Sequence, residues 1–141
     1  MVQPTVEVAT FVIHDGKLLL GKDENGKWRV PGGVINTFET CEKAAQRTFI
    51  EATGVGIKAE HILFVSEDID NPARHRIVVY AYGQYLQGEI SEKIPTYTDI
   101  QWVDVRELGP LQNGMTDDVI DAMFKFSLCL KAMNPNRKSQ A

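Results

Sequence analysis

The sequence predicts an α/β fold in which a mixed β-sheet lies between helices, and three observations support this prediction. A run rich in β-branched residues, Thr5 to His14, is followed at once by a hairpin-type turn. Apolar residues at helical spacing indicate a helix from about Cys41 to Thr53. Further strand-like runs and a second helical segment, which starts at Thr116, complete the order β-β-α-β-β-α.

The N-terminal strands are predicted to be joined by tight turns. Asp15-Gly16 is a hairpin turn, and Lys17 to Gly21 is the return strand. Asn25-Gly26 forms a second turn before a short strand, Trp28 to Val30. At Gly32-Gly33 we expect a backbone that can take positive φ and that a ligand can approach closely.

The first predicted helix has a start signal and a stop signal. Thr40 can cap its first turn, and Gly54 occupies the position that commonly ends a helix. Arg47 and Glu51 are four residues apart and therefore share one face. The expected buried stripe consists of Cys41, Ala45, Thr48, Phe49 and Ala52.

The C-terminal half is predicted to contain three strands and a helix. Ile62 to Ser66 is a strand, and Glu67 to His75 is an acidic loop. Arg76 to Leu86 is the longest strand; because its two faces are both apolar or aromatic, we expect it to be covered on both sides. Ile100 to Val103 is the last strand, and the final helix runs from Thr116 to Met133.

Length and composition predict one globular domain over residues 1–133, followed by a flexible polar tail over 134–141. The net charge of −4 argues against a general surface for nucleic acid or anionic membrane. Two cysteines without metal-type or redox-type spacing argue against a disulfide-built domain. We see neither a secretory signal nor an apolar run of membrane-spanning length, so we expect a cytoplasmic protein.

The most informative stretch is PGGVINTFETCEKAAQRTFIEATGV, from Pro31 to Val55. It resembles the signature of the Nudix hydrolase family, G-x5-E-x7-R-E-U-x-E-E-x-G-U, in which U is a bulky apolar residue. Thr48 and Ala52 stand where the pattern has acids. The later segment IQWVDVREL also resembles a recurring strand and acidic turn of the family. The positions that match the signature are Gly33, Glu39, Arg47, Phe49, Glu51, Gly54 and Val55.

The resemblance implies a Nudix-like α/β/α sandwich and a Nudix-type pyrophosphohydrolase. Its substrate would be a nucleoside diphosphate linked to another moiety, or a nucleoside triphosphate, and its cofactor Mg²⁺ or Mn²⁺. By position in the signature, the Gly33 carbonyl and Glu51 would hold metal, and Glu51 would also be catalytic. Arg47 would orient the acids, and Glu39 would support the helix entrance.

The two missing acids leave alternatives open. Acids outside the signature could complete the site, as the degenerate signature of the GDP-mannose hydrolases illustrates, or the chain could be a weakly active or inactive nucleotide-binding or protein-interaction module. In the second case the fold would be kept and catalysis lost. The candidate replacement acids are Glu67, Asp68, Asp70, Glu89, Glu92 and Asp99.

Substrate-binding residues are also expected outside the signature. Arg29, His75 and Arg76 are candidates for phosphate binding. His14 and His61 could act as general bases, although surface or strand-end positions are more common for such residues. The expected partner is a small-molecule nucleotide, with a homodimer left open. Aromatic candidates for base stacking, or alternatively for core packing, are Trp28, Tyr80, Tyr82 and Trp102.

Overall fold

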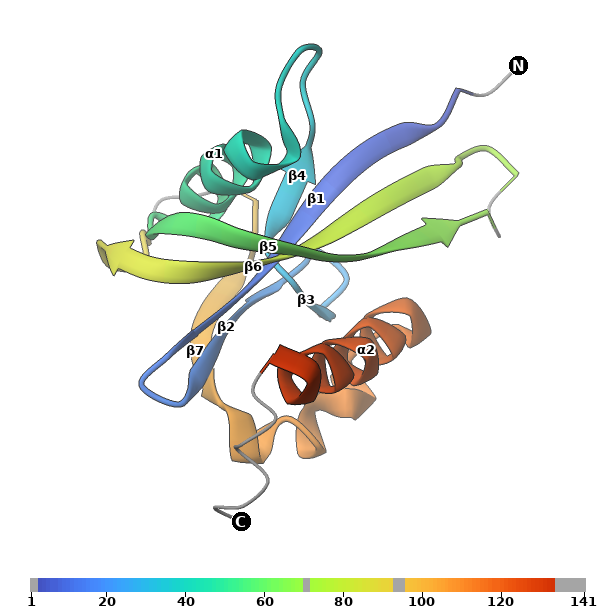
Figure 1. Cartoon of the computed structure of the whole chain (residues 1–141). Helices are drawn as coiled ribbons and strands as arrows, with labels where there is room; N and C mark the ends of the chain where they lie inside the picture. Colours follow the sequence, from blue (N-terminus) through green and yellow to red (C-terminus); the bar gives the residue numbers. More distant parts are fainter. Residues whose placement is uncertain (1–2, 70–71, 93–95, 134–141) are drawn as a thin grey trace.

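A computed structural model describes residues 3–69, 72–92 and 96–133 (Figure 1). Asp70, one of the candidate acids, and the predicted tail at 134–141 lie outside these ranges. The strands are β1 (Thr5–His14), β2 (Lys17–Lys22), β3 (Trp28–Arg29), β4 (Gly32–Val34), β5 (Gly56–Asp68), β6 (Arg76–Gln87) and β7 (Asp99–Asp104). The helices are α1 (Cys41–Thr53), α2 (Asp117–Met133) and the short 3-10 turns η1 (Val105–Glu107) and η2 (Pro110–Gly114).

The seven described strands form one mixed sheet, which confirms the predicted fold class. The main path is β3-β2-β1-β6-β5; β4 pairs with β1, and β7 pairs with β2. The β1–β6 pair is parallel, whereas the other pairs are antiparallel. In Figure 1 α1 lies on one side of the sheet and α2 on the other.

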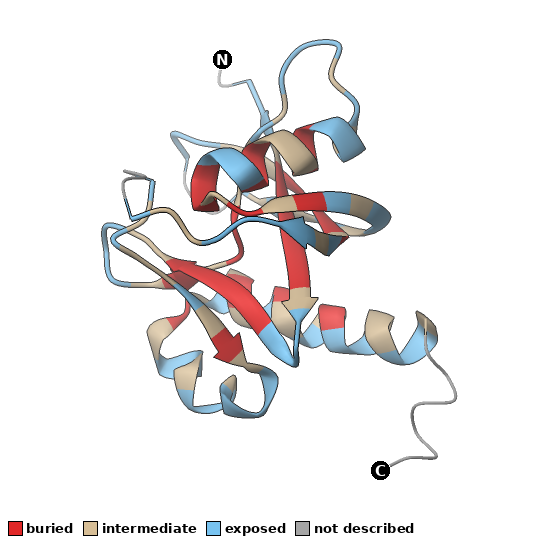
Figure 2. Ribbon diagram, turned by 90° about the vertical axis from the view of Figure 1, so that its left-hand side faces the viewer, coloured by how far each residue is buried: buried red, intermediate tan, exposed pale blue. Residues whose placement is uncertain are grey.

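Alternating side chains of β2 divide the core between the two faces of the sheet. Leu18 and Leu20 pack on the α2 side together with Phe126, whereas Leu19 packs on the α1 side with Phe49. All five side chains are buried. Figure 2 shows buried residues along the strands and on the sheet-facing sides of both helices. This two-sided burial agrees with the expectation for the long strand β6, where Tyr80 and Ala81 belong to different clusters.

Helix α1 begins and ends where its capping residues predicted. The Thr40 hydroxyl accepts a hydrogen bond from the Lys43 N–H at 3.2 Å. Gly54 has a φ of 86° and donates its N–H to the Ile50 carbonyl. Cys41 is an exception to the predicted buried stripe, because it is only half-buried at the first position of the helix.

Two local predictions are wrong. Gly32 and Gly33 are not among the residues with positive φ; they form β4, which pairs with β1. A Cβ on Gly32 would lie 1.9 Å from the Val8 carbonyl oxygen, so the missing side chain serves the close approach of another strand. The second error concerns β5, which begins at Gly56 rather than Ile62, because register shifts let the strand follow β6 along its whole length.

A candidate active site at the glycine strand and the first helix

Arg47 links α1 to the loop that precedes it. Its Nε donates to Glu39 Oε2 at 2.6 Å, and its Nη2 donates to Glu39 Oε1 at 2.8 Å, which makes a bidentate pair. The Asn36 N–H also donates to Glu39 at 3.0 Å. These bonds hold the pKa of Glu39 down at about 2, with Arg47 as the largest cause. Glu39 is therefore ionised near neutral pH, and the loop has a defined shape.

Arg47 also contacts Glu51 and β4. Its Nη1 donates to Glu51 Oε2 at 3.0 Å, and its Nη2 donates to the Val34 carbonyl at 2.9 Å. The partnership with Glu39 raises the pKa of Arg47 above its usual range. The three predicted catalytic residues Glu39, Arg47 and Glu51 thus lie in direct contact, next to the glycine strand that holds Gly33.

The positions of the missing acids face the protein interior. Thr48 and Ala52 are each 3% exposed, whereas the Glu51 side chain is 61% exposed. The Thr48 hydroxyl donates to the Ala44 carbonyl at 2.7 Å, so it is engaged in the helix and is not free to hold a water. A Cβ on Gly33 would lie 3.2 Å from Thr48 Cγ2. Position 48 therefore borders the glycine strand, as expected of a residue that would complete a site there.

The Glu51 carboxylate and the Gly33 carbonyl suit a divalent cation only if a substrate supplies further ligands. Among the described residues, no group of three or more His, Cys, Asp or Glu side chains is placed to hold a metal ion. Arg47 contacts Oε2 of Glu51, and Oε1 has no protein partner in the described structure. One carboxylate and the Gly33 carbonyl match the way Mg²⁺ binds through one or two protein ligands, substrate phosphates and water.

A small polar cavity of about 70 Å³ adjoins the other side of the glycine strand. Of the predicted substrate-binding residues, Arg29 and Arg76 line it, whereas His75 does not. His75 Nε2 instead lies 3.5 Å from Glu67 Oε2. The cavity is lined by Glu7, Val8, Ala9, Arg29, Val30, Gly32, Gly33, Arg76, Val78, Tyr80, Tyr97 and Val119.

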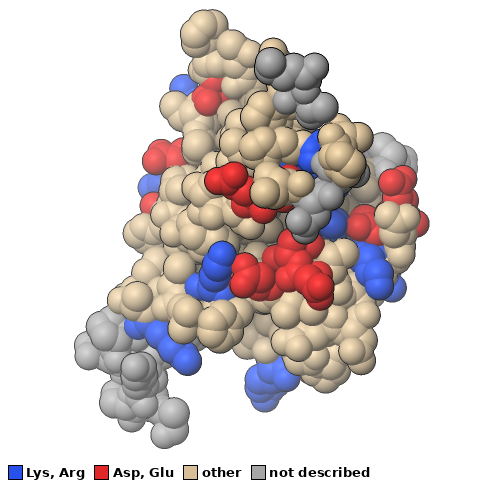
Figure 3. All heavy atoms as spheres, turned by 90° about the vertical axis from the view of Figure 1, so that its right-hand side faces the viewer, with Lys and Arg blue, Asp and Glu red and all other residues tan. Residues whose placement is uncertain are grey.

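Both arginines of the cavity already have carboxylate partners. Arg76 donates to Glu7 at 2.7 and 3.1 Å, and this pairing raises the Arg76 pKa. Arg29 lies 3.7 Å from Asp23 and 3.6 Å from Asp118. Figure 3 looks onto this side of the molecule and shows acidic side chains gathered in the middle of the face. The cavity therefore offers acceptors as well as donors.

Sequence reasoning did not single out Glu7 or Tyr97. Glu7 is a charged residue inside a β-branched strand, which is a weak signal of a polar site. The position of Tyr97 depends on contacts far away in the sequence and carried no signal. Of the aromatic candidates, Trp28 and Tyr80 are buried in the core, and burial raises the pKa of Tyr80 to about 12.

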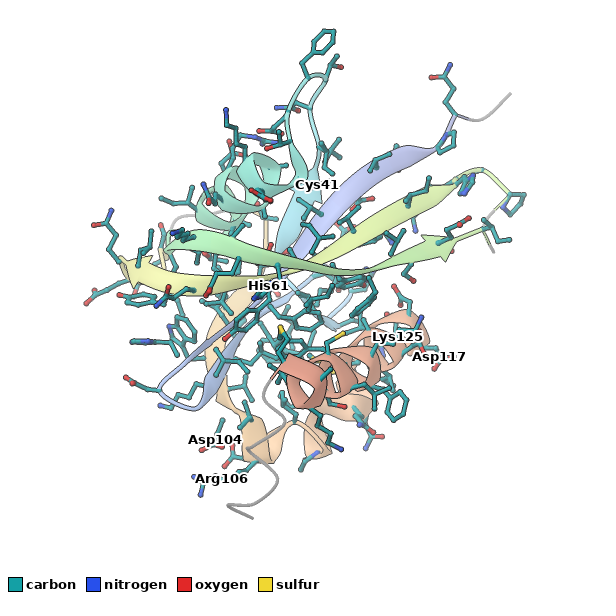
Figure 4. The ribbon with its side chains drawn as sticks, viewed as in Figure 1. Cys41, His61, Asp104, Arg106, Asp117 and Lys125 are labelled. Carbon is teal, nitrogen blue, oxygen red and sulfur yellow. The ribbon has the colours of Figure 1, made fainter. Side chains whose placement is uncertain are left out.

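The remaining candidates lie elsewhere. Asp99 accepts a hydrogen bond from Gln101 Nε2 at 2.7 Å in β7, and Asp68 contacts Arg74 and Arg76. In Figure 4, Asp104 and Arg106 lie at the opposite end of the molecule from α1, and His61 lies on β5. A larger, mainly apolar groove of about 660 Å³ between α2 and the β1–β2 hairpin includes no residue of the signature. No helix of the described residues is long and apolar enough to cross a membrane.

Comparisons with known proteins identify the relatives of this chain. Residues 3–123 match the family model of the NUDIX domain. The chain is 29% identical over 119 residues to phosphatase NudJ of Escherichia coli, covering 80% of this chain and 76% of that protein. It is 28% identical over 116 residues to an oxidized purine nucleoside triphosphate hydrolase of Danio rerio, covering 78% and 72%.

Solved structures show the same fold at lower identity. A NUDIX hydrolase from Nitrosomonas europaea superposes with a TM-score of 0.75 at 19% identity, covering 89% of this chain and 90% of that one. A MutT NUDIX hydrolase from Burkholderia pseudomallei superposes with a TM-score of 0.74 at 22% identity, covering 87% and 98%.

Proposed function

The chain belongs to the Nudix hydrolase family, and we propose that it cleaves the pyrophosphate bond of a nucleotide with Mg²⁺ or Mn²⁺ as cofactor. The substrate would be a nucleoside diphosphate linked to another moiety, or a nucleoside triphosphate. The observation that carries this proposal is the hydrogen-bonded group Glu39–Arg47–Glu51, anchored by Arg47 to the Val34 carbonyl of the glycine strand.

In the proposed reaction, a water oxygen attacks one phosphorus while the bond from that phosphorus to the bridging oxygen breaks. The water loses its protons to solvent or base, and the bridging oxygen leaves as part of the second phosphate product. A divalent cation held by Glu51, the Gly33 carbonyl and the substrate would neutralise phosphate charge. Arg47, fixed by Glu39, orients the Glu51 carboxylate, so the protein contributes positioning and electrostatics.

A binding module without catalysis is the second candidate, and one observation favours it. Glu51 is the only acid among the three acidic positions in this run of the helix, and it is already paired with Arg47. Incubation of the purified chain with nucleotides and Mg²⁺, with and without a chelator, separates the two candidates. Chelator-sensitive hydrolysis supports the enzyme, whereas nucleotide binding without turnover supports the module.

Glu51→Gln tests the central residue. The substitution keeps the shape and removes the charge, so turnover should fall by roughly 10²-fold or more, as for the loss of one preorganised electrostatic group. The melting temperature should barely change, because the side chain is mostly exposed. Glu42→Gln, at an exposed position of the same helix that the signature leaves unspecified, is the matched control. Equal turnover in Glu51→Gln and wild type would rule out this role.

A further inference from the structure

The cavity beside the glycine strand is too small for a nucleotide base in its present form. Its volume is about 70 Å³. Pockets that bind small molecules usually measure roughly 300–1,000 Å³, so this space suits a few water molecules. Yet the cavity touches Gly33, whose carbonyl would bind the metal and substrate in the proposed function. Part of the space that a ligand would need is therefore filled by the protein itself.

Tyr97 lines this cavity, and it comes from the segment just before β7. Its ring lies so close to Gly21 that a Cβ there would be 2.6–2.8 Å from three ring atoms. Its hydroxyl accepts a hydrogen bond from the backbone N–H of Gly32, and burial raises the pKa of the phenol, so the group is neutral near pH 7. The neighbouring Thr98 donates its N–H to the Lys22 carbonyl at 2.8 Å, which ties the chain to the end of β2. The ring thus has a defined position against β2, beside the cavity that Tyr97 lines.

The groups around the ring match a nucleobase better than a bare phosphate. The guanidinium groups of Arg29 and Arg76 are balanced by the carboxylates of Glu7, Asp23 and Asp118. A phosphate needs an excess of positive charge or free donors. The edge of a base carries donors and acceptors side by side, as these walls do. Removal of the ring would uncover such a mixed surface directly beside Gly32.

We propose that Tyr97 limits recognition of the nucleobase by occupying the base-binding part of the cavity, so that a nucleobase enters only when the ring is displaced. This inference rests on the proposed function, since it takes the glycine strand as the place where the nucleotide binds. Two consequences follow. Wild type should bind nucleotides that differ only in the base with similar affinities. Substitution of residue 97 should not change the affinity for a ligand that consists of phosphates alone.

Calorimetric titration of Tyr97→Ala tests the proposal with two probes, a non-hydrolysable imidodiphosphate analogue of a nucleoside triphosphate and inorganic tripolyphosphate, both with Mg²⁺. If the ring fills the cavity nine-tenths of the time, its removal should tighten nucleotide binding by about tenfold, with tripolyphosphate binding unchanged. Tyr97→Phe, which loses only the bond to Gly32, should shift affinity less and in the same direction. Weaker nucleotide binding by Tyr97→Ala would make Tyr97 a contact residue and overturn the proposal, as would an equal shift for both probes.

Two further variants guard against indirect effects. Gly21→Ala leaves Tyr97 in the chain but forces its ring to move, so it should also tighten nucleotide binding. Tyr85→Phe is the matched control: this tyrosine also bonds a backbone group, the Gly88 carbonyl at 2.8 Å, but does not line the cavity, so its removal should change neither affinity.

Displacement of the ring has a direct readout in wild type. With 3-fluorotyrosine in the chain, and the Tyr97 signal assigned through Tyr97→Phe, the nucleotide analogue should shift that fluorine resonance and tripolyphosphate should not. An unmoved resonance at nucleotide saturation would overturn the proposal. If no variant hydrolyses any nucleotide but Tyr97→Ala binds nucleotide more tightly, the hydrolase proposal fails and the Tyr97 proposal stands. If the chain hydrolyses nucleotide but Tyr97→Ala has unchanged affinities, the hydrolase proposal stands and the Tyr97 proposal fails.

Discussion

Phe38 combines two unfavourable features at a single residue. It has a φ of 62°, in the left-handed region, and its side chain is fully exposed in the loop between β4 and α1. For a bulky residue this backbone conformation costs roughly 1–2 kcal/mol. Its neighbour Glu39 carries the contact with Arg47, so the strain lies next to the proposed catalytic group.

Phe38→Gly should therefore stabilise the protein. Relief of the left-handed strain is offset in part by the larger entropy of glycine in the unfolded chain, which leaves a gain of ~0.5–1 kcal/mol. Asp15→Gly is the control: Asp15 has a φ of 52° at an exposed turn, and aspartate tolerates this region better, so the gain should be smaller. Chemical denaturation measures both. A loss of stability in Phe38→Gly would show that the aromatic ring makes a stabilising contact.

Two buried threonines should respond to substitution in opposite directions. The Thr10 hydroxyl is buried without a hydrogen-bond partner in the described structure, whereas the Thr53 hydroxyl donates to the Phe49 carbonyl at 2.7 Å and accepts from the Val55 N–H at 3.1 Å. Thr10→Val should stabilise the chain by about 1 kcal/mol, because an unsatisfied polar group is removed. Thr53→Val should destabilise it by a similar amount. If urea denaturation shows that both substitutions stabilise the chain, or that both destabilise it, this account of the two hydroxyl groups is wrong.

At the level of elements, α1 was predictable because its signals are local. Thr40 and Gly54 define its ends, and Arg47 and Glu51 are placed on one face by helical spacing alone. The beginning of β5 at Gly56 was not predictable, because it depends on bulges in its pairing with β6. The arrangement at Gly32 and the position of Tyr97 follow from contacts with β1 and β2, which no local pattern encodes.

The burial of position 48 in helix α1 determines how restoring a signature acid there would change stability. Thr48 is 3% exposed, so Thr48→Glu buries a carboxylate and should cost ~2 kcal/mol or more without metal. If position 48 borders a metal site at Gly33, Mg²⁺ should recover part of that loss, because the ion would bind the folded state preferentially. Thr48→Gln, which is uncharged, should show no recovery. Melting temperatures with and without Mg²⁺ measure the difference; identical responses would place the metal elsewhere.

Across the whole molecule, two lowered carboxyl pKa values predict the response to acid. The pKa values of Glu39 and Asp104 are about 2, chiefly because of hydrogen bonds from Arg47 and Arg106. A lowered pKa means that the folded state binds fewer protons than the unfolded state in this range. The stabilisation is thus present above the ordinary values of 4.5 and 3.8, and it is lost as the pH falls towards 2.

Melting temperatures recorded between pH 6 and pH 2 should consequently fall below about pH 4.5. Glu39→Gln should flatten the decline, since the glutamine has no charge to lose. Asp104→Asn should do so independently, because Asp104 and Arg106 lie at the opposite end of the molecule from α1, the helix that holds Arg47. A decline of unchanged steepness in both variants would assign the acid sensitivity to other carboxylates.

The parallel pairing of β1 with β6 determines the order in which the sheet can form during synthesis. β1 ends at His14, but its partner begins only at Arg76, so a ribosome that adds roughly 5–20 residues per second leaves β1 without that neighbour for several seconds. During this interval the nascent chain can form the local β1–β2 hairpin, while Val8, Phe11 and Val12 have no covering strand. The glycine strand pairs with β1 as well, and Glu39, Arg47 and Glu51 all precede β6 in the chain. The proposed catalytic group can therefore form on the unfinished sheet, before the parallel neighbour of β1 has been synthesised.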